Sequence, residues 1–244
     1  MKISGLTVLI SGGGAGIGLS LAQAFAKAGC KVIICGRNAD TLQKARSEVP
    51  DVVAAQCDIA SQESVRALAD MFAKQVDILV NNASISQVID LAAPSATVED
   101  QIAEVDINLL GMLRMMHAFL PSLLKKPESA IVNVSSALAF IPSADRPVYC
   151  ATKAATHSLT LSLRHQLRGT KVKVFELMPP WTDTPMAAQV RGVPKLAPEK
   201  VAAALIEAIS TDRYEITPGL SRATKLMSRF APAFGFSQLN KTVR

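Results

Sequence analysis

A tyrosine and a lysine stand four positions apart in the stretch PVYCATKAATHS (147–158), as Tyr149 and Lys153. On a helix this spacing places both side chains on one face, so the ammonium group can lie near the phenol. A free phenol has a pKa of about 10 and is a poor base at neutral pH, but a neighbouring positive charge favours its ionised form. Such a pair could move a proton to or from a carbonyl or alcohol oxygen. One Tyr-x-x-x-Lys spacing is weak evidence by itself, so the surrounding elements decide its meaning.

The elements that would position this pair alternate regularly along the chain. Short runs rich in Val and Ile, apolar on both faces, are typical of buried parallel strands. They occupy residues 7–11, 31–35, 51–56, 76–82, 130–135 and 171–177, with a weaker seventh run at 214–217. Helical patterns lie between them at about 17–28, 39–48, 62–74, 97–124, 148–168 and 198–210. This order predicts a single α/β domain over residues 1–220, a Rossmann fold with a doubly wound, mostly parallel seven-stranded sheet and helices on both faces.

A glycine-rich turn follows the first predicted strand. The sequence SGGGAGIG (11–18) sets Gly12, Gly14, Gly16 and Gly18 before a helix. Glycines allow a tight turn and the close approach of a pyrophosphate, while the helix N-terminus offers free N–H groups and a positive dipole end. The position between strand and helix favours a dinucleotide site over the alternative, a plain structural turn.

The residues after the second predicted strand favour NADP(H) over NAD(H). An acidic side chain there would bond the ribose hydroxyls of NAD and repel a 2′-phosphate. This chain has Gly36 and Arg37 instead, and an arginine can fork onto a phosphate. A solvated turn residue is the alternative interpretation of Arg37. After the third run, Asp58 and Ile59 stand where an adenine ring would lie.

These motifs together resemble those of the short-chain dehydrogenase/reductase superfamily. The resemblance covers about residues 5–220, and the matching stretches are SGGGAGIG, Asp58, NNAS (81–84), Asn108 in INLLG, IVNVSS (131–136), Tyr149 with Lys153, and MPPWTDTPM (178–186). Within the superfamily, PVYCATKAATHSLTLSLRHQLR and MPPWTDTPM look most like the DltE-type oxidoreductases, named for operons of D-alanine esterification. The resemblance implies an NADP(H)-dependent enzyme that interconverts a carbonyl and an alcohol by hydride transfer.

The resemblance also implies individual roles. The catalytic set would be Asn108, Ser136, Tyr149 and Lys153, where Ser136 is preferred to Ser135 because it lies thirteen residues before the tyrosine. Tyr149 would be the general acid/base, Ser136 would fix the substrate oxygen, and Asn108 would hold a water that relays protons. Lys153 would also bond the nicotinamide ribose. The cofactor-binding residues would be Gly12, Gly14, Gly16, Ile17, Gly18, Arg37, Asp58, Ile59, Asn82, Ala83, Tyr149, Lys153, Pro179, Thr182 and Thr184.

Two positions depart from the family pattern. Ser84 replaces the usual glycine after Asn-Asn-Ala, and Pro180 replaces the glycine of the usual Pro-Gly. Proline fixes φ and has no N–H, so we expect a stiffer loop near Thr182, whose backbone would meet the nicotinamide carboxamide.

Apolar side chains beyond the strand ends suggest an apolar substrate pocket. Phe140, Ile141, Trp181 and Met186 lie where this architecture forms its ligand crevice, with core packing as the alternative for each. A carbonyl reductase is the leading hypothesis. The alternative is a catalytically slow NADP(H)-binding or sensing protein, tethered to a membrane surface by its tail.

Residues 221–244 form a basic, amphipathic tail. They contain Arg222, Lys225, Arg229, Lys241 and Arg244 and no acidic residue, while the whole chain has a net charge of +6. Because the rest is nearly neutral, a basic nucleic-acid-binding face is not expected. The tail could close the substrate pocket, dock on a neighbouring subunit or rest on an anionic membrane; packing on the protein is favoured over the membrane.

A helix that is apolar on more than one side predicts a homodimer or homotetramer. In LLGMLRMMHAFL (109–120) only Arg114 and His117 are polar, so we expect this helix to pack on a partner together with the small residues of 150–163. Deeper burial within the monomer is the alternative. The cysteines and histidines show no metal-like clustering, so no metal is expected. The chain has no membrane-spanning run and no secretory pattern at its start, which predicts a cytoplasmic location.

Overall fold

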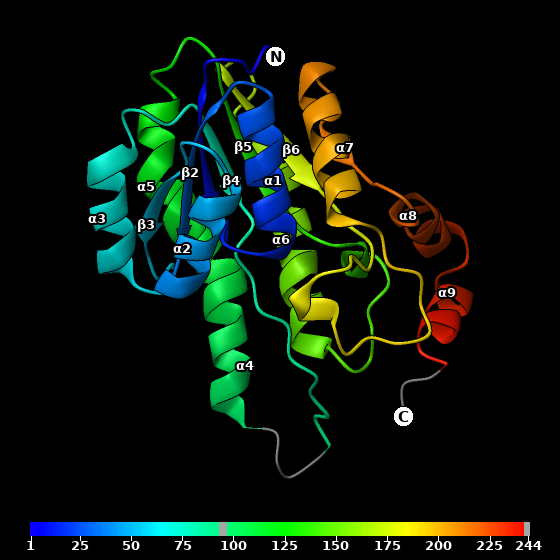
Figure 1. The fold of residues 1–244 in the computed structure, drawn as a ribbon. Helices are drawn as coiled ribbons and strands as arrows, with labels where there is room; N and C mark the ends of the chain where they lie inside the picture. The colour runs from blue at the N-terminus through cyan, green and yellow to red at the C-terminus, as the bar shows by residue number, and fades with distance from the viewer. Residues whose placement is uncertain (93–96, 242–244) are drawn as a thin grey trace.

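Seven parallel strands form the centre of the computed structural model, which describes residues 1–92 and 97–241 (Figure 1). They pair in the order β3-β2-β1-β4-β5-β6-β7, which confirms the doubly wound α/β class. The chain therefore reverses its winding between β1 and β4, the place where a ligand crevice opens at the carboxyl ends of the strands. The strands are β1 (Thr7–Ser11), β2 (Lys31–Gly36), β3 (Val53–Gln56), β4 (Ile78–Asn81), β5 (Ser129–Val134), β6 (Val172–Leu177) and β7 (Glu215–Ile216).

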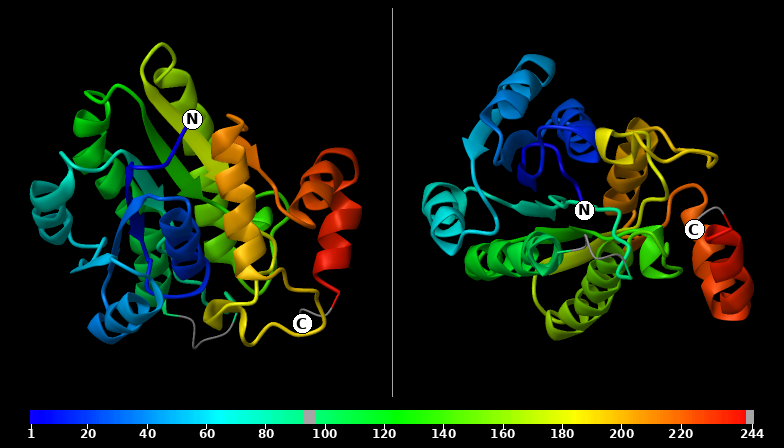
Figure 2. Two further views of the ribbon diagram at one scale, coloured as in Figure 1. Left: turned by 45° about the horizontal axis from the view of Figure 1, so that its top comes forward. Right: turned by 90° about the horizontal axis from the view of Figure 1, so that it is seen from below.

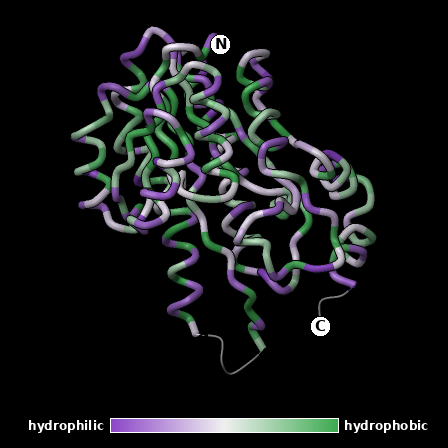
Figure 3. The backbone as a smooth tube through the Cα atoms, in the orientation of Figure 1, coloured by the Kyte–Doolittle hydropathy of each residue, from purple (hydrophilic) through white to green (hydrophobic). Residues whose placement is uncertain are grey.

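Helices cover both faces of the sheet and enclose two apolar cores (Figure 2). One face carries α1 (Gly16–Lys27), α2 (Ala39–Glu48) and α7 (Pro198–Ser210), and the other carries α3 (Gln62–Phe72), α5 (Met112–Leu123) and α6 (Pro147–Gln166). Phe25 and Phe175 are fully buried in the first core, and Phe119 is fully buried in the second. The hydrophobic colouring of Figure 3 gathers accordingly on the inner strands. The sheet is thus a rigid platform whose strand ends hold the loops of the site.

The helix predicted over residues 97–124 is divided by a π-helical turn. It comprises α4 (Val98–Val105), the turn η1 (Asp106–Gly111) and α5. Within η1, the Asn108 side chain bonds the backbone of Ile85 in both directions: Ile85 N–H donates to Oδ1 at 2.8 Å, and Nδ2 donates to the Ile85 carbonyl at 2.9 Å. Single π turns inside α-helices recur at functional sites, and here the turn positions Asn108 beside the loop after β4.

The tail folds into two helices on the flank of the molecule beyond α7, as Figures 1 and 2 show. These are α8 (Ser221–Phe230) and α9 (Pro232–Leu239). Asn240 holds α9 against the loop after β5, because its Nδ2 donates to the Pro142 carbonyl at 3.1 Å and its Oδ1 accepts from Ala144 N–H at 2.6 Å. Arg244 lies outside the described residues.

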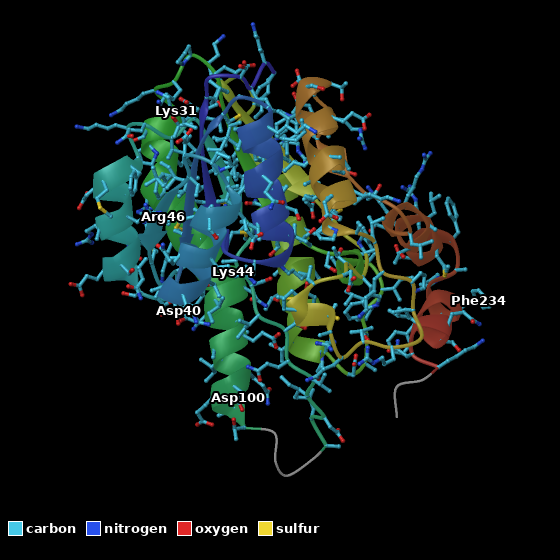
Figure 4. The ribbon with its side chains drawn as sticks, viewed as in Figure 1. Lys31, Asp40, Lys44, Arg46, Asp100 and Phe234 are labelled. Atoms are coloured by element: carbon cyan, nitrogen blue, oxygen red, sulfur yellow. The ribbon has the colours of Figure 1, made fainter. Side chains whose placement is uncertain are left out.

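Helix α8 does not bury its apolar side chains and expose its basic ones, as an amphipathic helix packed on the protein would. Lys225 turns inward to pair with Glu215, whereas Leu226 and Phe230 are exposed on the outer face. Phe234, on the outer side of α9, is 59% exposed (Figure 4). Among the residues that the structure describes, no helix combines the length and the apolar character needed to cross a membrane.

Candidate active site

One cavity of about 340 Å³ opens at the carboxyl ends of β1, β4, β5 and β6. The glycine-rich turn forms one wall, α6 contributes Tyr149 and Lys153, and the segment after β6 forms another wall. The tail contributes Thr224 and Leu239. Of the predicted site residues, the cavity is lined by Gly12, Gly16, Ile17, Gly18, Asn82, Ala83, Ser136, Tyr149, Lys153, Pro179, Trp181, Thr182, Thr184 and Met186.

The glycine-rich turn is built so that backbone lines the cavity. Gly12 has φ of +64°, and a Cβ there would come within 2.8 Å of the Ala83 Cα. A Cβ at Gly18 would overlap the Gly12 carbonyl oxygen. Ala15, the N-cap of α1, provides no side-chain cap, so the first N–H groups of the helix have no side-chain partner at that position. A bare backbone cradle at a helix N-terminus fits the pyrophosphate of a dinucleotide.

The loop after β4 is fastened to this turn through Ser11. The Ser11 hydroxyl accepts from the backbone N–H groups of Asn82 at 3.0 Å and Ala83 at 3.1 Å. Asn82 Nδ2 donates to the carbonyls of Ser11 and Gly12, at 3.0 and 3.2 Å. Ser84, which departs from the family pattern, follows Ala83 in the sequence and lines the cavity. Four hydrogen bonds therefore hold the two loops together beside the crevice.

Tyr149, Ser136 and Lys153 converge on the cavity from two elements. Ser136 follows β5, and its side chain lies close enough to the phenol of Tyr149 on α6 to favour the ionised form. Lys153 is buried, its Nζ donates to the Val134 carbonyl at 2.9 Å, and it lies 5.4 Å from the centroid of the Tyr149 ring. A phenol, a hydroxyl and an ammonium group that face one cavity can bind a substrate oxygen and supply it with a proton.

Burial shifts the pKa values of both ionisable groups in this trio. It raises the pKa of Tyr149 to about 12, and the hydrogen bond with Ser136 opposes that rise only in part. Burial lowers the pKa of Lys153 to about 8, with partial opposition from the Glu104 carboxylate. We expected Lys153 to favour the ionised phenol, but the net direction for Tyr149 is opposite, because desolvation outweighs the favourable contacts. At neutral pH the phenol therefore keeps its proton.

Asn108 acts as a tie between three elements. Besides its two bonds with Ile85, its Nδ2 donates to Thr152 Oγ1 of α6 at 3.2 Å. The side-chain oxygen and nitrogen are thus both used on protein atoms, and the side chain is 3% exposed. This arrangement locks the loop after β4 to the helix that carries Tyr149 and Lys153.

The outer cofactor residues lie beyond the cavity. Arg37 is exposed, and its carbonyl accepts from Gln56 Nε2 at 2.9 Å. Its neighbour Asn38 caps α2, the helix on which Figure 4 labels Asp40, Lys44 and Arg46. Asp58 and Ile59 follow β3; the Asp58 carboxylate accepts from Ala60 N–H at 3.0 Å, and Ile59 is buried against the position of Gly111. Gly14 packs close to Thr41 of α2.

The predicted substrate residues divide into two groups. Trp181 and Met186 line the cavity, whereas Phe140 and Ile141 are not among its lining residues. Phe140 packs edge-on against His157, and Ile141 is buried next to Gly235. Sequence reasoning missed a set of apolar walls, because their contribution depends on where the segment after β6 and the tail come to lie: Leu138, Val193, Leu220 and Leu239.

Buried charges behind the cavity were also missed. Arg146 is 4% exposed, its Nη1 donates to Ser86 Oγ at 2.9 Å, and its guanidinium lies 5.5 Å from the Trp181 ring centroid. Glu104 is fully buried on α4, and its Oε1 accepts from Gln87 N–H at 3.2 Å. Sequence gives little signal for such residues, since charged side chains are usually solvated. Across the described residues, no cluster of three or more His, Cys, Asp or Glu could hold a metal ion.

Comparison with known proteins gives consistent matches. A family described as short chain dehydrogenase matches residues 6–193. The uncharacterized oxidoreductase DltE of Bacillus subtilis is 45% identical over 187 residues, which are 75% of this chain and 74% of the relative. A short chain dehydrogenase from Burkholderia cenocepacia, solved in complex with NADP, has a TM-score of 0.87 at 28% identity and covers 98% of this chain and 99% of its own. A Burkholderia phymatum relative in complex with NAD has a TM-score of 0.81 at 25% identity, with 94% and 95% coverage.

Proposed function

Because the chain belongs to the short-chain dehydrogenase family, we propose that it is an NADP(H)-dependent oxidoreductase that interconverts a carbonyl compound and an alcohol. The observation that carries this proposal is the convergence of Tyr149, Ser136 and Lys153 on the cavity that the glycine-rich turn also lines. The bound nicotinamide would supply the hydride for reduction. The protein would supply the proton and the hydrogen bonds around the reacting oxygen.

In the reducing direction, Tyr149 would donate its proton to the oxygen that becomes the alcohol. With its pKa raised to about 12, Tyr149 carries at neutral pH the proton that this role requires, as a phenol with the ordinary pKa of about 10 also would. The Ser136 hydroxyl would donate to the same oxygen and stabilise the negative charge that develops on it. Lys153, buried beside the tyrosine ring, would hold the cofactor's ribose and place a positive charge near the site.

The cofactor preference rests on the end of β2. Gly36 offers no carboxylate to the ribose hydroxyls. Arg37 is exposed and stands two positions after Cys35, whose carbonyl accepts from the N–H groups of Gly12 and Gly13 in the glycine-rich turn. Both features support NADP(H), because a repelling charge is absent at Gly36 and a phosphate-binding group is present at Arg37. The related structures include one bound to NADP and one bound to NAD, so the choice within the family falls to these residues.

The substrate class follows from the walls of the cavity. Leu138, Trp181, Met186, Val193 and Leu239 present apolar surface around the catalytic group. Within the described chain, Lys153 is the only residue with a formal charge among those that line the cavity. These walls support an uncharged, largely apolar carbonyl compound as substrate. Lys153 is assigned to the cofactor's ribose, so an ionised group on the substrate would be desolvated here without a partner of its own.

The proposal is tested by a screen for NADPH oxidation. Purified protein would be offered ketones, aldehydes, keto esters and quinones, and the loss of NADPH absorbance would be followed against an enzyme-free blank. We expect turnover to be greatest among apolar ketones or aldehydes and small for free keto acids. Quenching of protein fluorescence by NADPH without turnover on any member of the panel would contradict the enzyme and favour a cofactor-binding or sensing protein.

The tail is expected to set the affinity for substrate. Replacing Asn240 by alanine removes the two bonds that hold α9 to the loop after β5, and Leu239 next to it lines the cavity. Two hydrogen bonds of about 1 kcal/mol each predict a rise in substrate KM of about fivefold to thirtyfold, with little change in the KM for NADPH. Gln238→Ala, an exposed change on the same helix, is the matched control. Equal substrate KM values for both variants would contradict a closing role for the tail.

We further propose that the protein forms a homodimer or homotetramer through α5, η1 and α6. Leu110, Leu113 and Leu161 expose 40%, 37% and 42% of their surface on these elements. Leu113→Glu is expected to lower the molar mass measured by light scattering to that of a smaller assembly, because a buried carboxylate at the interface would be unpaired. Met71→Glu on α3, which is 55% exposed, should leave the mass unchanged. A monomeric wild-type protein at micromolar concentration would refute the proposal.

A further inference from the structure

A buried carboxylate, that of Glu176, contacts Ser135, the residue that precedes Ser136. Glu176 of β6 is fully buried, and its two oxygens lie 3.0 and 2.8 Å from Nδ1 of His157 on α6. Its Oε1 also accepts from the hydroxyl of Ser135 at 2.5 Å. A buried carboxylate destabilises the fold unless partners compensate its charge, and here the partners are Ser135, which follows β5, and His157 on α6. Ser135 immediately precedes Ser136, so the Glu176 carboxylate holds the start of segment 135–140, which contains Ser136.

The same imidazole contacts the other end of this segment. The Phe140 ring meets the His157 ring edge-on, with centroids 5.2 Å apart and an interplanar angle of 74°. Between the two ends runs the single turn η2 (Ala137–Ala139), which starts where the Ser136 hydroxyl accepts from Leu138 N–H at 3.1 Å. His157 therefore contacts segment 135–140 at one end through Glu176 and at the other end directly.

The helix α6 joins this contact to the proton donor. His157 follows Lys153 by four positions and Tyr149 by eight, so the three side chains lie along one face of a continuous helix. One rigid element thus presents the phenol to the cavity and also fixes the segment that presents Ser136. A positional error of about 1 Å between such groups can cost a hundredfold in rate.

We propose that His157 is a positioning residue which, with Glu176, clamps segment 135–140 and thereby sets the Ser136 hydroxyl relative to Tyr149. This inference rests on the proposed function only for its kinetic consequence, because the clamp itself is a property of the fold. It assigns a use to the fully buried Glu176 and the partly exposed His157, which lie outside the catalytic set.

The charges around His157 give the clamp a direction with pH. Glu176 of β6 and Glu215 of β7 raise the pKa of His157, chiefly through the hydrogen bond with Glu176, while burial and Lys225 of α8 oppose the rise. A raised pKa means that the stabilisation is fully present below the unfolded value of about 6.5 and is lost as the pH rises through the folded value. The clamp should therefore loosen on the alkaline side, where the buried carboxylate loses its cationic partner.

The test compares His157→Gln with His165→Gln, an exposed histidine on the same helix. Hydrogen–deuterium exchange is measured in peptides covering 135–140 and, as internal reference, 12–18. We expect His157→Gln to speed exchange in 135–140 about tenfold while 12–18 and the KM for NADPH stay within twofold of wild type. On a substrate found in the screen, kcat should fall at least tenfold. His165→Gln should change neither.

Rescue separates the clamp from a general loss of stability. The double variant His157→Gln/Glu176→Gln has no buried charge but keeps hydrogen-bonding groups, so its exchange in 135–140 should return to within about threefold of wild type. Unchanged exchange in His157→Gln, or faster exchange spread over the whole chain, would overturn the proposal. Should His157→Gln not fold, Ser135→Ala removes only the bond to Glu176 and must give the same local effect. Normal clamping in a protein without turnover would instead refute the proposed function alone.

Discussion

Replacing Tyr149 by phenylalanine is expected to lower kcat for carbonyl reduction by about a thousandfold. The substitution removes the phenolic hydroxyl and with it the proton donor, while the ring that packs 5.4 Å from Lys153 Nζ is retained. General acid catalysis contributes about a hundredfold to ten-thousandfold in enzymes, and the raised pKa of Tyr149 keeps this acid fully protonated at neutral pH. Because the ring stays, the KM for NADPH should change by less than about threefold. The measurement is steady-state NADPH oxidation with the best substrate of the screen.

The chain offers a matched control for this experiment. Tyr214 is the other of its two tyrosines, and it is 38% exposed, where its ring packs against Phe175. Tyr214→Phe makes the same chemical change away from the cavity and should leave kcat within twofold of wild type. A Tyr149→Phe protein that keeps more than a tenth of the wild-type kcat would refute the assignment of Tyr149 as the proton donor.

Much of the fold could be predicted because local sequence and tertiary structure agree in it. The apolar, β-branched runs of residues 7–11 and 31–35 become β1 and β2 with almost the same bounds, since only a strand buried on both faces suits them. The break in the predicted helix 97–124 could not be foreseen. At this break Asn108 bonds the backbone of Ile85, which is 23 positions away in the sequence, and a local pattern gives no signal of such a contact.

The site shows the same division. The glycine-rich turn and the Tyr149–Lys153 pair are local patterns, so sequence places them at the strand ends. Glu176 has no such signal, because a carboxylate within a strand is buried only if distant partners such as His157 reach it. The inward turn of Lys225 to Glu215 likewise needs the path of the tail. The cytoplasmic location remains a prediction.

Removing the Arg37 side chain should raise the KM for NADPH about tenfold to a hundredfold and leave the KM for NADH nearly unchanged. A hydrogen bond to a charged group contributes about 1.5–3 kcal/mol, which corresponds to this range of KM. NADH has no 2′-phosphate, so its binding loses no such bond when Arg37 is replaced. The exposed Arg37 side chain can fork onto a phosphate without giving up an ion pair, because no ion pair within 4.0 Å in the described chain involves Arg37. The measurement is the ratio of kcat/KM for the two cofactors in Arg37→Ala and wild type.

Arg46→Ala is the matched control, since it removes the same charge from α2, the helix that begins directly after Arg37 and Asn38 (Figure 4). A general loss of positive potential near the cofactor would weaken NADPH in both variants by a similar small factor, because exposed charges are screened by salt over about 8–10 Å. A specific contact would weaken it in Arg37→Ala alone, and the effect would persist at higher ionic strength. Equal KM values for NADPH and NADH in the wild-type protein would remove the preference itself. Gly36 would then be a position that merely lacks a carboxylate, and Arg37 a solvated residue of the turn.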